Sequence, residues 1–287
     1  MVPERVTERD GRVLPATRWT SLVVFVILVP ALVILWGLPG RTADAWAWTI
    51  RPEYSAIFLG AGYGAGTYFF LRTLVARRWH PSAAGVFGAA FFAALMLVTT
   101  LVHWDRFNHG DAPFVGAAVF YGWVIVYVLS PVVVLRLWLL NRRTDRHSLD
   151  ATPAVPRGAQ LSARAAGVAA LASAAVFLLS PQTVIGVWGW ELTPLTARVV
   201  GCLVAQVGVG ALWLSVEERW SGWKLIVQTF FLATVLLFVG AARAWDDFDK
   251  GRPATWLYLG ALVASDLALA VLYRSMTRKE AVADGGV

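Results

Sequence analysis

Apolar residues along the chain are gathered into eight long segments that alternate with shorter polar stretches. The segments cover residues 20–38, 56–75, 84–102, 115–135, 165–180, 199–216, 225–242 and 256–273. A bilayer core of about 30 Å needs about 20 helical residues, and most of the segments fit that length. Strands of a membrane barrel would alternate apolar and polar residues, whereas residues 22–29 are apolar throughout. The pattern predicts an all-α polytopic membrane protein with eight transmembrane helices.

Basic residues are distributed unevenly between the two predicted sides of the membrane. The two termini and the even-numbered loops hold 18 Lys and Arg residues, and the odd-numbered loops hold 7. Cytoplasmic segments of membrane proteins carry the excess of Lys and Arg, so we expect both termini in the cytoplasm. The net charge of +7 therefore reflects topology and gives no reason to expect a nucleic-acid partner.

Composition supports this class and excludes others. The hydrophobic share is 58%, the charged share is 15%, and the chain has a single cysteine. A soluble globular domain is about 25% charged, and a disulfide scaffold needs several cysteines. We therefore expect the lipid bilayer as the main partner, with a membrane protein or a bound lipid as a further one.

The second half of the chain repeats the first at a shift of 141–142 residues. The matched pairs are Pro39/Pro181, Trp46/Trp188, Trp48/Trp190, Pro52/Pro194, Gly60/Gly201, Trp79/Trp220, Trp104/Trp245, Asp105/Asp246, Phe107/Phe248 and Gly110/Gly251. Since each copy holds four helices, the copies are predicted to be parallel about an axis along the membrane normal. The predicted organisation is a cytoplasmic tail (1–18), repeat 1 (19–140), a cytoplasmic linker (141–163), repeat 2 (164–273) and a cytoplasmic tail (274–287).

Most of the matched residues lie at the predicted outer side. Alternating tryptophans followed by proline are typical of a segment in the headgroup layer, either as an anchor or as a ligand site. We expect the aspartates to cap helix starts or to pair with Arg198 or Arg243. The candidate outer interfacial layer comprises Trp46, Trp48, Trp188, Trp190, Trp104, Trp245, Asp105, Asp246 and Arg198.

Glycines at every second position of the second predicted helix, residues 60–66, form overlapping G-x-x-x-G patterns. Small residues at this spacing allow helices to approach closely. We expect them to pack the second helix against the sixth; a substrate path lined by glycine backbone is the alternative.

Asp266 is the only charged residue near the middle of a predicted helix. A carboxylate inside a membrane is costly and suggests proton or cation coupling. Alternatively, Asp266 ties its helix to a polar neighbour such as Gln228, Thr229 or Tyr127. Gln206 and Gln228 are further candidates for a coupling or binding site.

One cluster has residue types that bind divalent metals: His103, Asp105, His109 and Asp111. Their spacing does not align them on one helix face, so a loop would have to gather them; a polar outer turn is the other interpretation. We expect no other cofactor, because none of the four histidines lies at the middle of a predicted helix, where haem ligands would be needed.

The motif W-G-W-E-L-T-P-L-T-A-R-x-x-G occupies residues 188–201, and a fainter copy occupies residues 46–60. The resemblance that it indicates spans nearly the whole chain. On this motif the chain resembles uncharacterised Trp-rich multi-pass membrane proteins of high-GC, actinobacterial-type bacteria. The resemblance implies a bacterial plasma membrane and supplies no activity.

Three functions are compatible with these patterns. The first is a non-enzymatic integral membrane protein that binds lipid or a partner, or has an accessory role, through its outer Trp layer. The second is a small-solute or ion transporter with Asp266 as the coupling carboxylate. The third is a membrane enzyme that uses the cluster at residues 103–111.

Overall fold

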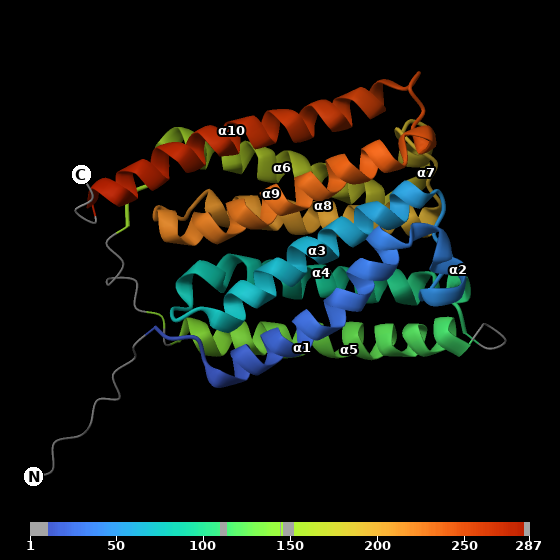
Figure 1. Ribbon diagram of the computed structural model, residues 1–287, viewed down its shortest axis with the longest axis horizontal. Helices are drawn as coiled ribbons and strands as arrows, with labels where there is room; N and C mark the ends of the chain where they lie inside the picture. The colour runs from blue at the N-terminus through green and yellow to red at the C-terminus, as the bar shows by residue number, and fades with distance from the viewer. Residues whose placement is uncertain (1–10, 110–113, 144, 146–151, 284–287) are drawn as a thin grey trace, which may run out of the picture.

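The computed structural model describes residues 11–109, 114–143, 145 and 152–283, and every long element in these ranges is a helix. The long helices run roughly along the longest axis of the molecule (Figure 1). They are α1 (Pro15–Leu32), α3 (Glu53–Val75), α4 (Ala83–Val102), α5 (Phe114–Arg142), α6 (Arg157–Leu179), α8 (Pro194–Leu214), α9 (Trp220–Arg243) and α10 (Pro253–Ala283). Short helical turns join them: η1 (Val33–Gly37), η2 (Pro39–Arg41), α2 (Thr42–Ala45), η3 (His80–Ser82), η4 (Trp104–Arg106), α7 (Pro181–Ile185) and η5 (Trp245–Asp247).

Seven helices in the described part are long and apolar enough to cross a membrane: α1 with η1, α4 with η3, α5, α6, α8, α9 and α10. Helix α3 is 23 residues long but less apolar, because it contains four glycines and three tyrosines. Most side chains of α3 are buried against other helices, so they are shielded from the surrounding solvent whatever its nature. The seven helices support a multi-pass helical membrane protein.

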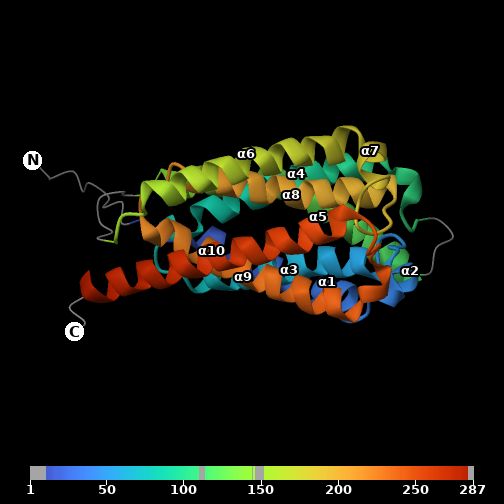
Figure 2. The same ribbon diagram turned by 90° about the horizontal axis from the view of Figure 1, so that it is seen from above.

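The helices form two layers, and each layer takes two long helices from each half of the chain. Packing runs α1–α3–α9–α10 in one layer and α6–α8–α4–α5 in the other. In Figure 2 the α6–α8–α4–α5 layer fills the upper part of the view, and the α1–α3–α9–α10 layer fills the lower part. The central helices α3, α4, α8 and α9 therefore hold the two halves together. The segments 19–140 and 164–273, predicted as two tandem units, are interleaved rather than separate bodies.

Glycines allow close helix contacts both within each half and between the halves. A Cβ atom on Gly60 would lie 2.8 Å from the backbone nitrogen of Trp36, and one on Gly208 would lie 2.8 Å from Cγ of Leu171. The glycines of the second predicted helix contact several neighbours: Gly60 meets η1, Gly64 lies between α9 and α1, and Gly66 meets α1. Only Gly62 meets α8, at Leu203. The expected packing of α3 on α8 through the glycine stripe is thus found at Gly62 alone, and α8 uses its own glycines Gly201 and Gly208 to pack on α6.

Helices extend further than the apolar segments at the end of the molecule where α1 begins and α10 ends (the terminal end; Figure 1). Helix α6 begins at Arg157, inside the predicted linker, and α10 continues to Ala283, inside the predicted tail. The extension of α10 is anchored by Met276, which is fully buried, and by Lys224, whose Nζ lies 2.8 Å from a carboxylate oxygen of Glu280. Hydropathy does not register such a continuation, because a helix that leaves the apolar zone becomes polar without ending.

The outermost helices of the two layers are packed differently. Helix α5 buries Trp123, Tyr127 and Trp138 along its contact with α4. In α10, the buried side chains of the described residues are Thr255 and Met276, close to its two ends. The middle of α10 is therefore the most loosely packed part of a long helix in the molecule.

Candidate functional site

The two tryptophans of the first motif copy lie inside the protein, at the end opposite the terminal end. Trp46 and Trp48 are 4% and 2% exposed. Their rings pack edge-on against Trp123 of α5, with centroids 5.7 and 5.1 Å away. Such pairs stabilise a core by about 0.5–1.5 kcal/mol beyond the area that they bury. These indoles join the first connection to α5 and do not form a lipid-facing layer.

The two tryptophans of the second motif copy, Trp188 and Trp190, pack in a similar aromatic cluster. Trp190 is 1% exposed, and its indole N–H donates to Oγ of Ser55 at 3.0 Å. Trp188 is half-buried and packs against Phe177 and Trp190, with ring centroids 4.9 and 5.1 Å away. Trp190 therefore links the second half of the chain to α3 of the first half.

The remaining tryptophans of the predicted layer are closer to the surface. Trp104 is 41% exposed and packs on Phe120. Trp245 is half-buried, and Lys250 Nζ lies 5.4 Å from its ring centroid. The two motif copies thus contain both kinds of tryptophan, and a headgroup position fits Trp104 best.

The matched aspartates do not take the partners expected for them. Asp105 and Asp246 are exposed and pair with their chain neighbours Arg106 and Lys250, at 3.2 and 3.5 Å. The cap comes from Asp247, which no repeat pattern singled out. Its carboxylate accepts the backbone N–H of Tyr54, in the first turn of α3, at 2.8 Å. Residue 106, the counterpart of Asp247, is an arginine, so the duplication contained no signal for this cap.

The two arginines expected beside these aspartates bind carbonyl groups at helix ends. Arg198 donates from Nε to the carbonyl of Leu178 at 2.9 Å, and from Nη1 to Nε2 of His103 at 2.7 Å. Arg243 donates to the carbonyl of Trp36 at 2.7 Å and stacks over its ring. Cations at the C-terminal ends of α6 and of the α1–η1 helix interact favourably with the carbonyl groups there.

Arg198 also bears on the predicted metal cluster. Burial and the Arg198 charge both lower the pKa of His103, and its Nε2 already accepts the Arg198 hydrogen bond. His109 lies 3.1 Å from the carbonyl of Trp104, and Asp111 is outside the described residues. Among the residues that the structure describes, no three His, Cys, Asp or Glu side chains are placed to hold a metal ion.

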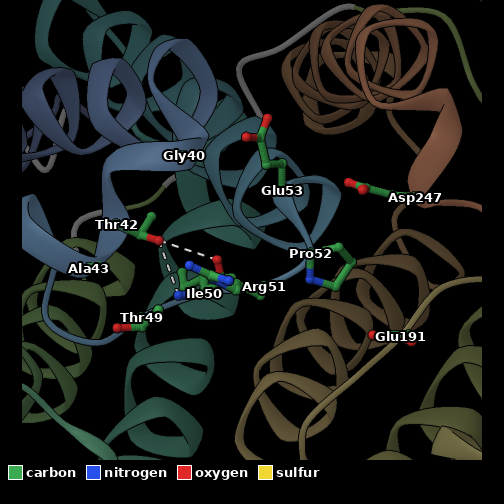
Figure 3. Close-up of a pocket in the computed structure, with 10 residues that line it drawn as sticks. All are labelled: Gly40, Thr42, Ala43, Thr49, Ile50, Arg51, Pro52, Glu53, Glu191 and Asp247. Carbon is green, nitrogen blue, oxygen red and sulfur yellow. Dashed lines mark hydrogen bonds between the residues drawn. The ribbon is translucent and has the colours of Figure 1, made fainter.

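A pocket of about 370 Å³ opens beside the Asp247 cap. Figure 3 shows Glu53 and Asp247 on one side of it and Glu191 on the other, with Arg51 beside Ile50. The wall beneath them is fixed by Thr42, whose hydroxyl bonds both the carbonyl and the N–H of Ile50. The pocket lies between the first and fifth connections of the chain, and Glu53, Glu191 and Arg51 are exposed there.

Asp266 lies at the middle of α10, on the side that faces α9. The hydroxyl of Thr234 donates to its carboxylate at 3.0 Å. None of the three partners expected from the sequence makes this contact: Thr229 donates to the carbonyl of Leu225, and Tyr127 bonds Tyr63. The interpretation of Asp266 as a tie between helices is right in kind, but its partner lies more than a turn further along α9.

Gln228 forms the neighbouring link between the same two helices. Its side-chain carbonyl accepts from the Tyr68 hydroxyl at 3.0 Å, and its amide donates to the Tyr273 hydroxyl at 2.9 Å. Three helices, α3, α9 and α10, are thereby joined in one polar chain. Gln206 is not part of it; on α8, its Cγ lies 3.6 Å from the place where a Cβ on Gly88 would be.

Together these bonds form a polar ladder along α10: Tyr258 to Tyr54, Asp266 to Thr234, Tyr273 to Gln228 and Glu280 to Lys224. The α10 members are spaced by seven or eight residues, which places them on one side of a helix. A polar bond between helices in a membrane contributes about 0.6 kcal/mol on average. The seam between α9 and α10 combines these weak polar bonds with an apolar cluster near the terminal end, where Trp220 packs with Met276 and Tyr273. The seam between α4 and α5 is instead packed with the aromatic side chains of α5.

A second buried polar cluster, at the terminal end, has no counterpart in the sequence analysis. His80 lies 3.3 Å from Glu217 and 3.6 Å from Asp145, and Arg219 donates to its Nδ1 at 3.0 Å. Burial by itself raises the pKa of Glu217, but His80 and the N–H groups of Arg219 outweigh it and lower that pKa to about 2. The cluster ties the η3 turn to the connection between α8 and α9.

The comparisons with known proteins add no relative to this geometry. No protein-family model matches the chain, and searches of curated proteins and of solved structures likewise gave no match.

Proposed function

We propose that the chain is an integral membrane protein with eight transmembrane helices, α3 being the eighth, in a bacterial plasma membrane with both termini in the cytoplasm. The 23-residue length of α3 and its central place among seven apolar helices support the count. The excess of Lys and Arg near the terminal end supports the orientation. The bacterial origin rests on the sequence resemblance alone.

The eight helices are two copies of one four-helix unit in this proposal, and matched backbone contacts support it. The pairs recur at the same shift of 141–142 residues: Asn108 N–H to Ala47 carbonyl with Asp249 N–H to Gly189 carbonyl, and Trp79 N–H to Gly11 carbonyl with Trp220 N–H to Pro153 carbonyl. The interleaved layers agree with a twofold relation, which exchanges α3 with α8 and α4 with α9. Copies related in this way share a scaffold, so a function is best sought where they differ.

The largest difference is the α9–α10 seam, and it is the observation on which the functional proposal rests. Its counterpart, the seam between α4 and α5, is filled by side chains such as Trp123 and Trp138, whereas the middle of α10 has no buried side chain among the described residues. The protein is a non-enzymatic binding or accessory protein, and α10 is the helix against which a lipid or a partner's transmembrane helix packs. The buried Trp core holds the scaffold that presents this helix.

Photo-cross-linking in whole cells tests this proposal. A photoreactive residue at Ala264, on the exposed face of α10, should give a defined adduct. The matched control is Val128 on α5, which is 48% exposed at a comparable distance from the start of its helix. Adducts of equal yield at both positions, or none at Ala264, would refute a binding role for α10.

A second function, small-solute or ion transport with Asp266 as the coupling carboxylate, is favoured by one observation. Asp266 has a single described hydrogen-bond partner, Thr234, at the middle of a loosely packed helix. A carboxylate in such a place can take up and release a proton. Proteoliposomes with an entrapped pH dye and an imposed potassium gradient should then show proton flux, and Asp266→Asn should abolish it. An absence of flux above that of empty liposomes would remove this candidate.

A further inference from the structure

Three arginines line a pocket of about 290 Å³ at the terminal end of the molecule. Arg12 precedes α1, Arg18 lies in its first turns, and Arg77 follows α3. Arg12 and Arg77 are exposed and Arg18 is half-buried. The described lining of this pocket is thus entirely cationic.

The backbone around the pocket places these arginines together. Val13 N–H donates to the carbonyl of Arg77, and Trp79 N–H donates to the carbonyl of Gly11, so residues 11–13 and 77–79 form an antiparallel bridge. Gly11 has φ +64°, a left-handed conformation that favours glycine. The guanidinium of Arg18 is fixed from the other side by a 2.9 Å bond from Nη2 to the carbonyl of Ala76.

The other half of the chain has the same backbone bridge without these three arginines. Val155 N–H donates to the carbonyl of Glu218, and Trp220 N–H donates to the carbonyl of Pro153, which reproduces the bridge. At the shift of 141–142 residues, Ala154 stands for Arg12, Gln160 for Arg18 and Glu218 for Arg77. The fold therefore forms this bridge without arginines at these three positions, so the backbone bridge does not require the three charges.

Three arginines line this pocket, and planar guanidinium forks match the oxygens of a phosphate. The pocket lies where α1 and α3 leave the apolar zone, and Trp19, next to Arg18, is 68% exposed as an interfacial aromatic would be. Basic pockets between transmembrane helices at this level bind the headgroups of anionic lipids.

We propose that Arg12, Arg18 and Arg77 form a binding site for the phosphate group of an anionic membrane phospholipid. The site is separate from the α9–α10 seam and does not depend on what binds there. It uses a membrane anion as ligand, with the headgroup in the pocket and the acyl chains along α1.

Lipid binding to the purified full-length chain tests the proposal. The probe is phosphatidylglycerol, titrated into protein in mild detergent and followed by native mass spectrometry, with phosphatidylcholine as the zwitterionic reference. The double variant Arg12→Gln/Arg77→Gln keeps the Arg18 bond to the backbone. It should bind phosphatidylglycerol roughly 25-fold more weakly, at about fivefold for each basic residue near the membrane surface.

The matched control is Arg157→Gln/Arg164→Gln, which removes the same charge from exposed positions on α6. It should change the affinity less than about twofold, because these residues lie outside the pocket. Equal weakening by the two double variants would overturn the proposal, since general attraction by basic residues would then explain the binding. Thermal unfolding in detergent without added lipid should be the same for all three proteins.

A free phosphate ion has the same chemistry, and a competition arm separates it from a lipid. Excess inorganic phosphate should leave the bound phosphatidylglycerol in place, because the acyl chains add to the affinity. Full displacement by inorganic phosphate, with the same loss in Arg12→Gln/Arg77→Gln, would overturn the lipid assignment. A variant with lysine at both positions retains the charge and loses the guanidinium fork, so it should bind with intermediate affinity.

Discussion

Two glycines near the C-terminal end of α8, Gly208 and Gly210, have different surroundings. A Cβ atom on Gly208 would lie 2.8 Å from Cγ of Leu171 and 3.1 Å from the backbone nitrogen of that residue. A Cβ atom on Gly210 would meet nothing within 4 Å. The substitutions Gly208→Ala and Gly210→Ala therefore add the same methyl group to the same helix, once against α6 and once in open space.

The expected magnitudes follow from two terms. In a helix interior, alanine is favoured over glycine by about 1 kcal/mol, and both variants gain this term. Overpacking costs about 1–3 kcal/mol, and only Gly208→Ala incurs it, because the backbone of α6 cannot shift as a flexible side chain would. Gly208→Ala should thus be less stable than Gly210→Ala by about 1–3 kcal/mol.

The assay is reversible unfolding of the purified protein in mixed micelles, with the denaturing detergent increased stepwise and tryptophan fluorescence as the readout. Gly210→Ala should unfold at a higher detergent fraction than the wild type, and Gly208→Ala at a lower one. If the two midpoints coincided, the close contact between α6 and α8 would contribute nothing. Such a result would contradict a stabilising role for the close approach of Gly208 to Leu171.

Three further predictions concern single side chains, all with the free energy of unfolding as readout. Asp247→Ala should destabilise the protein by about 1 kcal/mol, because the first-turn N–H of α3 loses its cap, whereas Asp246→Ala should have no effect, since that side chain is exposed; equal effects would contradict the cap. Trp190→Phe should lower the free energy of unfolding by about 1 kcal/mol more than Trp46→Phe does, because the Trp190 N–H donates to a hydroxyl on α3 and the Trp46 N–H has no partner among the described residues. The reverse order of the two variants would contradict this difference. The pKa of Glu217 is lowered from 4.5 to about 2 on folding, so its contribution to the free energy of unfolding is present above pH 4.5 and is lost as the pH falls toward 2. Glu217→Gln should lack this loss, and parallel pH profiles of variant and wild type would argue against the His80 cluster.

The positions of the long helices could be predicted from hydropathy, because a helix in lipid must be apolar for about the thickness of the bilayer. The helix count by apolar composition differs by one, and α3 explains the difference. Its side chains contact other helices, so glycine and tyrosine are tolerated there. Hydropathy detects contact with lipid, and it is a weaker signal for a central helix.

Burial of the matched tryptophans could not be predicted, because an indole suits both a headgroup layer and a protein core. The sequence shows that Trp48 and Trp190 recur, but recurrence is equally compatible with anchoring and with packing. The deciding observation is a contact between distant segments: Trp48 with Trp123 of α5, and Trp190 with Ser55 of α3.

The partner of Asp266 illustrates a more general limit and a signal that was overlooked. In water, an amphipathic pattern identifies the inward face of a helix, but in lipid both faces are apolar, and the rotation of α10 is not marked by hydropathy. Polar residues are the remaining marker, since each must bond to another helix. Tyr258, Asp266, Tyr273 and Glu280 recur at intervals of seven or eight residues, which defines one face of α10. That interval predicts a polar seam along the whole helix, whereas Asp266 considered alone predicts an isolated site.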